Sequence, residues 1–145
     1  MKYGSILIVE DNSDDEYLTV RTLKKHNPSR DLIVARDGEE AMDYIFGTGK
    51  YETSDSRTLP HLVLLDLKLP RTDGFEVLRK IRRDDRTRLL PVVVLSSSGE
   101  EDDILRSYEL GANSYIEKPT DFSRFEEIIM SLATYWCCLN IAPLL

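Results

Sequence analysis

The sequence lacks the features that mark several common classes of protein. No uninterrupted apolar run approaches the roughly 18 to 20 residues that a membrane-spanning helix needs, so no membrane partner is expected. The chain has 19 basic and 26 acidic residues, and the resulting net charge of −7 argues against non-specific nucleic-acid binding. No signal peptide is recognisable before the first apolar segment. We therefore expect a cytoplasmic protein.

Cysteine and histidine are also scarce. The two cysteines, Cys137 and Cys138, are neighbours in the sequence, and adjacent cysteines fit disulfide geometry poorly. The two histidines do not cluster with them, so a structural zinc site is not expected. Stability must then come from an apolar core, and 145 residues with 41% hydrophobic content suffice for one domain.

The sequence does contain a regular alternation of short apolar runs and amphipathic segments. The runs predicted as strands are 5–9, 31–35, 62–67, 91–95 and 114–117. The segments with helical spacing begin at Ser13, Asp37, Asp73, Glu100 and Asp121. Strict alternation implies a parallel sheet covered by helices on both faces. We predict an α/β fold with a doubly wound five-stranded parallel sheet of the flavodoxin type, strand order 2-1-3-4-5.

Local signals refine this picture. Ser13 and Glu16 form a capping-box pair at the first helix, and an aspartate caps each of three later helices, namely Asp37, Asp73 and Asp121. The polar segment 47–60 is long for a connection, and we predict an ordered surface excursion there. The basic run 79–83 is interpreted as a solvated helix face and not as a nucleic-acid site.

Polar residues at the strand ends define the candidate site. Glu10 and Asp11 end the first strand, Asp66 the third, Ser96 the fourth and Lys118 the fifth. The carboxyl ends of parallel strands meet at one edge of the sheet, so these groups should converge. Three close carboxylates repel one another, and Mg²⁺ would relieve that repulsion. Asp66 could then act as a nucleophile that carries an acyl phosphate, with Lys118 and Ser96 compensating its charge.

This set of residues resembles the receiver domains of two-component response regulators. The resemblance covers about residues 4 to 136, and it rests on Glu10-Asp11, Asp66 with Pro70 and Asp73-Gly74, Ser96 and Lys118-Pro119. It implies that Asp66 is the phosphoacceptor and that Asp11 and Asp66 bind Mg²⁺ directly. The backbone carbonyl of Lys68 would be a third protein ligand, and Glu10 would act mainly through water.

The resemblance also implies a switch. Lys118 would grip the phosphoryl group, Ser96 would swing toward it, and Tyr115 would follow by rotating inward. The Lys118–Pro119 bond is expected to be cis, as is typical of the family. The protein would catalyse only its own phosphorylation and dephosphorylation, and in that sense would not be an enzyme.

Two departures from the commonest family pattern are a Glu-Asp acid pair and a serine at position 96. With the long segment 47–60 and the tail 137–145, the chain is similar to single-domain response regulators that partner bacterial phytochromes, especially cyanobacterial ones. We therefore expect one receiver domain over 1–145, with its core at about 4–136. The expected partners are a sensor histidine kinase, a phytochrome in the narrower interpretation, a phosphotransfer protein, and a second copy through helix four, strand five, helix five and the tail.

Two other functions remain open at this point. A phosphatase of the haloacid dehalogenase type also uses an aspartyl nucleophile on an α/β sheet, but it needs a second aspartate two positions later, where this chain has Lys68. A receiver-like scaffold that is never phosphorylated is the other alternative. The presence of both Asp66 and Lys118 argues against it.

Overall fold

The computed structural model describes residues 4–52 and 59–143, and in them strands and helices alternate as predicted. The strands are β1 (Ile6–Val9), β2 (Leu32–Ala35), β3 (Leu62–Leu65), β4 (Val92–Ser96) and β5 (Ser114–Glu117). The α-helices are α1 (Ser13–His26), α2 (Gly38–Phe46), α3 (Gly74–Arg83), α4 (Glu101–Glu109) and α5 (Phe122–Thr134). A short 3-10 helix (Gly49–Tyr51) follows α2, and a π-helical turn (Tyr135–Leu139) extends α5.

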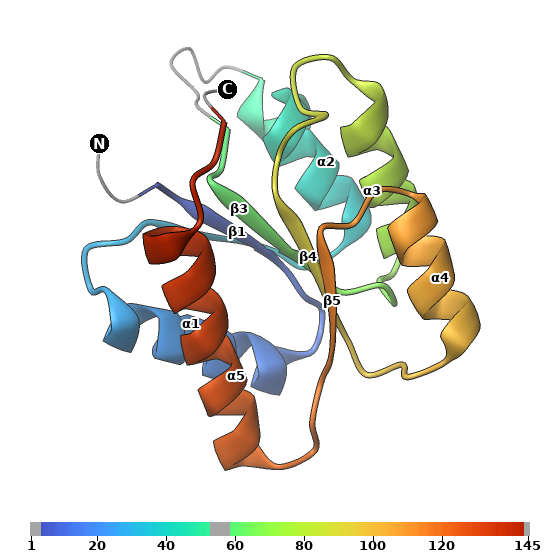
Figure 1. Cartoon of the computed structure of the whole chain (residues 1–145). Helices are drawn as coiled ribbons and strands as arrows, with labels where there is room; N and C mark the ends of the chain where they lie inside the picture. Colours follow the sequence, from blue (N-terminus) through green and yellow to red (C-terminus); the bar gives the residue numbers. More distant parts are fainter. Residues whose placement is uncertain (1–3, 53–58, 144–145) are drawn as a thin grey trace.

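The sheet has the predicted topology. Its strand order is β2-β1-β3-β4-β5, and every neighbouring pair is parallel. Figure 1 shows α1 and α5 side by side on one face of the sheet, with α2, α3 and α4 on the other. No helix in residues 4–52 and 59–143 is both long and apolar enough to cross a bilayer.

The core consists of two apolar layers, one on each face of the sheet. Leu7 and Val9 of β1 point toward the layer under α2 and α3, whereas Ile6 and Ile8 point toward the layer under α1 and α5. Side chains alternate between faces along a strand, so a strand covered on both sides must be apolar throughout. The central strands β1, β3 and β4 are accordingly buried along their whole length.

The first helix begins differently from the prediction. Asn12, and not Ser13, is its N-cap, and the Asn12 side chain accepts a hydrogen bond from the backbone N–H of Asp15 at 2.9 Å. Glu16 does not complete a capping box, because its carboxylate forms two hydrogen bonds with Arg36, just after β2, at 3.0 and 2.8 Å. The expected Ser13–Glu16 pair is therefore wrong.

The three predicted aspartate caps have different outcomes. Asp37 and Asp73 each accept a hydrogen bond from the backbone N–H three residues later, at 2.7 and 3.0 Å, which is the usual N-cap arrangement. Asp121 occupies the N-cap position of α5 but its side chain makes no capping hydrogen bond. The first two predictions are confirmed, and the third is confirmed in position alone.

Arg82 is an exception to the solvated basic face. Its guanidinium donates to the carbonyls of Gly111 and Leu90, both at 2.8 Å, and to the Asn113 side chain at 2.9 Å. Burial lowers the pKa of Arg82 from its usual range. The side chain thus joins the end of α3 to the segment that enters β5, and the interpretation of the whole run as solvated is wrong at this residue.

The long segment after α2 is partly ordered against the domain. Lys50 forms an ion pair with Glu40 at 3.1 Å, and the Tyr51 ring packs edge-on against Tyr44 at 5.0 Å between centroids. The prediction for 47–60 is thus supported up to Glu52, and residues 53–58 lie outside the described chain.

The C-terminal tail does not pack fully on the domain. Trp136 and Cys137 lie against the apolar layer of α1 and α5, whereas Leu139 is 67% exposed and Ile141 is 93% exposed. The chain therefore packs on its own domain as far as Cys137, the first residue of the tail. Packing on a partner chain stays a prediction.

Candidate functional site

Three carboxylates meet at the carboxyl ends of β1 and β3. Glu10 and Asp11 directly follow β1, Asp66 directly follows β3, and the two strands pair in register with Val9 opposite Leu65. One carboxylate oxygen of each acidic residue lies within 4.8 Å of the others. Glu10 and Asp66 are buried, and Asp11 is exposed to solvent. The sequence prediction that these three groups converge is confirmed.

Lys118 completes this cluster from the end of β5. Its Nζ atom lies 2.8 Å from Glu10 Oε1, 2.9 Å from Asp15 Oδ2 and 3.1 Å from Asp66 Oδ2, and only 8% of its side chain is exposed. Its backbone N–H is fixed by the carbonyl of Ser96 at 2.7 Å. The lysine therefore neutralises part of the charge of the three carboxylates that it touches.

The expected cis bond before Pro119 is absent. The Lys118–Pro119 peptide is trans, as are the other peptide bonds of the described residues. The prediction of a cis bond is therefore wrong for this structure. In this structure the long, flexible lysine side chain reaches the carboxylates from a trans peptide.

Burial and charge shift the protonation of two groups in the cluster. Burial raises the pKa of Glu10 to about 7, although the hydrogen bond and charge of Lys118 oppose this shift. For Lys118, burial lowers the pKa, but the hydrogen bonds and charges of Glu10, Asp66 and Asp15 outweigh burial and raise the pKa above its usual range. The lysine is thus a permanent cation near neutral pH, whereas Glu10 titrates there.

Ser96 and Tyr115 are joined through one residue of the loop after β4. The Ser96 Oγ atom is fully buried and accepts a hydrogen bond from the Ser98 N–H at 3.1 Å, and the Tyr115 hydroxyl donates to the Ser98 carbonyl at 2.8 Å. The Ser98 hydroxyl donates to Asp103 of α4 at 2.6 Å. Sequence reasoning missed Ser98, because it is the last of three consecutive serines and only the first of them, Ser96, ends the apolar run.

The segment after β3 lies tightly over the site. The backbone N–H of Lys68 donates to Asp66 Oδ1 at 3.3 Å, and the Lys68 side chain is exposed. Gly74 begins α3 so close to Asp66 that a Cβ atom added there would lie 2.3 Å from the Asp66 carbonyl oxygen. This close approach explains why a glycine follows Asp73 in the motif.

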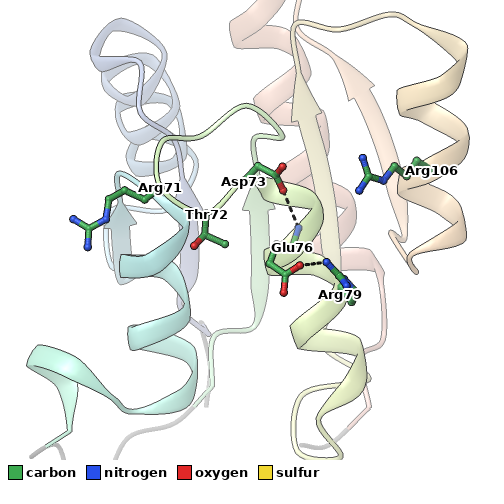
Figure 2. Close-up of a pocket in the computed structure, with 6 residues that line it drawn as sticks. All are labelled: Arg71, Thr72, Asp73, Glu76, Arg79 and Arg106. Carbon is green, nitrogen blue, oxygen red and sulfur yellow. Dashed lines mark hydrogen bonds and ion pairs between the residues drawn. The ribbon is translucent and has the colours of Figure 1, made fainter.

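A surface depression lies beside this site but shares no lining residue with the carboxylate cluster. It has a volume of about 300 Å³ and lies between α3, the loop before it and α4. Figure 2 shows the Asp73 carboxylate bonded to the backbone of Glu76, the Glu76 carboxylate bonded to Arg79, and Arg71 directed away from them. Arg71 forms an ion pair with Glu39 of α2. Arg106 lies over the Phe75 ring, 4.1 Å from its centroid, so each charged side chain that lines the depression has a partner nearby.

The comparisons with known proteins agree with this geometry. Residues 6–130 match the family described as the response regulator receiver domain. The chain belongs to that family. The receiver domain is 39% identical over 131 residues to the response regulator Rcp1 of Synechocystis sp., with 90% of this chain and 87% of that protein covered. It is 38% identical over 138 residues to a probable methanogenesis regulatory protein, FilR2, of Methanothrix harundinacea, with 95% and 86% covered.

Solved structures give the same result. A crystal structure of the phosphorylated cyanobacterial phytochrome response regulator RcpA matches with a TM-score of 0.92 at 38% identity, covering 98% of this chain and 99% of that one. The Mn²⁺-bound form of Rcp1 matches with a TM-score of 0.90 at 37% identity, covering 97% and 99%. The receiver domain is therefore the signal-receiving part of a two-component system, a class that interacts with histidine kinases and binds divalent metal ions at an acidic site.

Asp15 is the member of the cluster that sequence reasoning missed. It lies in the first turn of α1, where acidic residues are common because they interact favourably with the helix dipole. That ordinary explanation hid its contact with Lys118, which lies 103 positions away in the sequence. Only the folded receiver domain brings the two side chains together.

Proposed function

We propose that this chain is a response regulator in which Asp66 accepts a phosphoryl group from the phosphohistidine of a sensor kinase. The observation that carries the proposal is the contact of the Lys118 amine with Asp66, 3.1 Å apart, inside a cluster of three carboxylates. A cation held beside a strand-end aspartate can stabilise negative charge on a group transferred to that aspartate. The membership of this chain in the receiver-domain family supports the same chemistry.

The transfer step is a displacement at phosphorus. A carboxylate oxygen of Asp66 forms a bond to phosphorus while the bond from phosphorus to the histidine nitrogen breaks, and the imidazole nitrogen keeps the electron pair and takes up a proton. Lys118 donates hydrogen bonds to the phosphoryl oxygens, and the Ser96 hydroxyl turns from Ser98 to donate another. Water later attacks the acyl phosphate, so the protein catalyses only its own phosphorylation and dephosphorylation.

The residues present fit a bound Mg²⁺ ion. Three carboxylate oxygens within 4.8 Å of one another supply the hard oxygen ligands that Mg²⁺ prefers, and their mutual repulsion favours a cation. We propose that Asp11 and Asp66 bind the ion directly, with the Lys68 backbone carbonyl as a further ligand and Glu10 acting through water. When bound, the ion would neutralise charge on the phosphoryl oxygens.

The affinity for Mg²⁺ should depend on pH through Glu10. Because burial raises the pKa of Glu10 to about 7, the metal-free protein carries a proton there that metal binding must displace. We expect the affinity to rise by up to about tenfold per pH unit below that pKa and to level off above it. Calorimetric titration with Mg²⁺ in buffers of different ionisation enthalpy will measure both the affinity and the proton released.

The same shift predicts how stability depends on pH. In the folded protein the pKa of Glu10 is raised from its ordinary value of 4.5 to about 7, so folding favours the protonated carboxyl group. The stability linked to this proton is therefore fully present below pH 4.5 and is lost as the pH rises through about 7. Mg²⁺ should therefore stabilise the protein most above that pKa.

The variant Glu10→Gln tests the role of Glu10 in the pH dependence of metal binding. Its Mg²⁺ affinity should be nearly independent of pH, and an affinity that depends on pH as in the wild-type protein would contradict the role of Glu10.

The output of the proposed switch lies on the face formed by α4, β5 and α5. Phosphorylation would draw Ser96 away from Ser98, and Tyr115, which holds the other side of Ser98, would shift with it and favour a second conformation of this face. Four large apolar side chains are exposed on its two helices, Leu105 and Tyr108 on α4 and Phe122 and Met130 on α5. Such groups suit a protein partner, and we propose a second copy of the chain, with a phosphotransfer protein as another partner.

A phytochrome kinase is the proposed input. The relatives RcpA and Rcp1 are described as a cyanobacterial phytochrome response regulator and a response regulator, and a third solved structure, 45% identical, is a bacteriophytochrome response regulator. They also match this chain over nearly its whole length. We propose on this ground that residues 1–145 act as one receiver domain with a core at about 4–136, in the cytoplasm with its kinase.

Acetyl phosphate, a small phosphoryl donor, tests the proposal directly. We expect the purified protein to gain one phosphoryl group in the presence of Mg²⁺ and none after chelation, as measured by intact-protein mass spectrometry. Peptide mapping should place the group on Asp66. Sustained hydrolysis of a phosphomonoester would indicate the phosphatase alternative, and a protein that gains no phosphoryl group would be the scaffold.

A further inference from the structure

The amine of Lys118 has no unused donor in this structure. An ammonium group has three N–H donors, and Lys118 Nζ has three acceptors, which are Glu10 Oε1, Asp15 Oδ2 and Asp66 Oδ2. If Asp66 becomes phosphorylated, the amine must move outward to reach the oxygens of the added group. That movement lengthens or breaks at least one of its present hydrogen bonds.

The burial of the three acceptors indicates which bond is given up. The Glu10 side chain is 4% exposed and the Asp66 side chain is 10% exposed, whereas the Asp15 side chain is 28% exposed. Leaving a buried carboxylate without its donor is costly, but water can replace the lysine at a partly exposed one. Asp15 is therefore the partner that Lys118 can leave at the lowest cost.

We propose that Asp15 is a positioning residue that restrains Lys118 in the unphosphorylated protein and releases it when Asp66 is phosphorylated. This inference rests on the proposed function of Asp66. The Asp15 carboxylate holds the amine at 2.9 Å and also repels an incoming phosphoryl group, so both effects favour the unphosphorylated state. Removing its charge should make phosphoryl-like anions bind more tightly.

The test uses beryllofluoride, which mimics a phosphoryl group on an aspartate, together with Mg²⁺. We expect Asp15→Asn to bind beryllofluoride roughly fivefold more tightly than the wild-type protein, as expected for loss of one partly exposed charge-assisted contact. Asp14→Asn is the matched control, because Asp14 is an exposed aspartate in the same helical turn and is not a partner of Lys118. Its affinity should stay at the wild-type value.

A second measurement needs neither metal nor phosphoryl mimic. In the metal-free wild-type protein, the Lys118 ammonium should give a slowly exchanging signal in lysine-selective nitrogen-15 NMR, because all three protons are bonded. Asp15→Asn should speed that exchange, and Asp15→Glu, which keeps the carboxylate, should restore both the signal and the beryllofluoride affinity. If Asp15 only stabilised the helix, Asp15→Asn and Asp14→Asn would have the same ammonium exchange rate and the same beryllofluoride affinity.

The possible outcomes separate the two proposals. If the wild-type protein does not bind beryllofluoride with Mg²⁺, the proposed function of Asp66 fails, and the role of Asp15 fails with it. If the wild-type protein binds but Asp15→Asn binds equally or more weakly, only the role of Asp15 is overturned. An ammonium signal that is unchanged in Asp15→Asn also overturns it.

Discussion

Replacing Asp66 with asparagine is expected to abolish phosphoryl uptake from acetyl phosphate. Asparagine has nearly the same shape, although its single amide oxygen can accept only one of the two hydrogen bonds that Asp66 accepts, from Lys118 at 3.1 Å and from the Lys68 backbone N–H at 3.3 Å. Its amide oxygen is a far weaker nucleophile than a carboxylate oxygen, so no acyl phosphate should form. Intact-protein mass spectrometry after incubation with acetyl phosphate and Mg²⁺ will show whether the added group is lost.

The control for this substitution is Asp73→Asn. Asp73 lies in the same connection between β3 and α3, so this control makes the same chemical change close to Asp66. Its carboxylate caps α3, and asparagine caps helices equally well. We expect Asp73→Asn to be phosphorylated like the wild-type protein. Uptake of the phosphoryl group by Asp66→Asn at the wild-type rate would mean that Asp66 is not the acceptor.

Replacing Lys118 with methionine should slow phosphoryl uptake by at least about 100-fold, the usual cost of losing one preorganised group that stabilises transition-state charge. Methionine keeps the apolar stem but has no amine to donate to the phosphoryl oxygens. The rate of phosphorylation by acetyl phosphate, followed at saturating Mg²⁺, measures this effect.

The same substitution should also destabilise the metal-free protein. The raised pKa of Lys118 keeps the amine charged throughout the neutral range, and its contribution to stability would be lost only above its ordinary value of 10.5. Without it, Glu10, Asp15 and Asp66 lose their shared cation, which should lower the free energy of unfolding by about 3 kcal/mol. Urea denaturation at neutral pH with and without Mg²⁺ will test this, since the ion should restore part of the loss.

Lys80→Met provides the matched control for Lys118→Met. Lys80 is an exposed lysine on α3, so the variant loses the same charge outside the cluster. Both its phosphorylation rate and its stability should stay close to the wild-type values. If the two methionine variants behave alike, Lys118 has no special role in the cluster.

Much of the fold was predictable because the central strands are buried on both faces. In β1, in β3 and in β4 up to Leu95, every side chain belongs to one of the two apolar layers, so each strand is an apolar run that stands out from the amphipathic helices. The polar residue that ends such a run is equally conspicuous. Hydrophobic patterning along the chain was therefore enough to assign Glu10, Asp66 and Ser96 to one edge of the sheet.

Other features could not be predicted because several residues could satisfy the same local rule. Asn12 and Ser13 are both good helix caps, and in the structure Asn12 is the cap while Glu16 pairs with the distant Arg36. Arg82 resembled the other exposed cations at the end of α3, yet it binds the carbonyl of Gly111, 29 positions away in the sequence. Such choices depend on neighbours that are remote along the chain.

The sequence by itself determined the alternation of strands and helices, the parallel sheet and the edge where its polar residues gather, because hydrophobic periodicity is a local property of the chain. The tertiary structure alone decided that the Lys118 amine donates hydrogen bonds to Glu10, Asp15 and Asp66. It also decided that Ser98 forms hydrogen bonds with both Ser96 and Tyr115. Those contacts depend on the direction and reach of side chains across the sheet edge, which no spacing along the chain encodes.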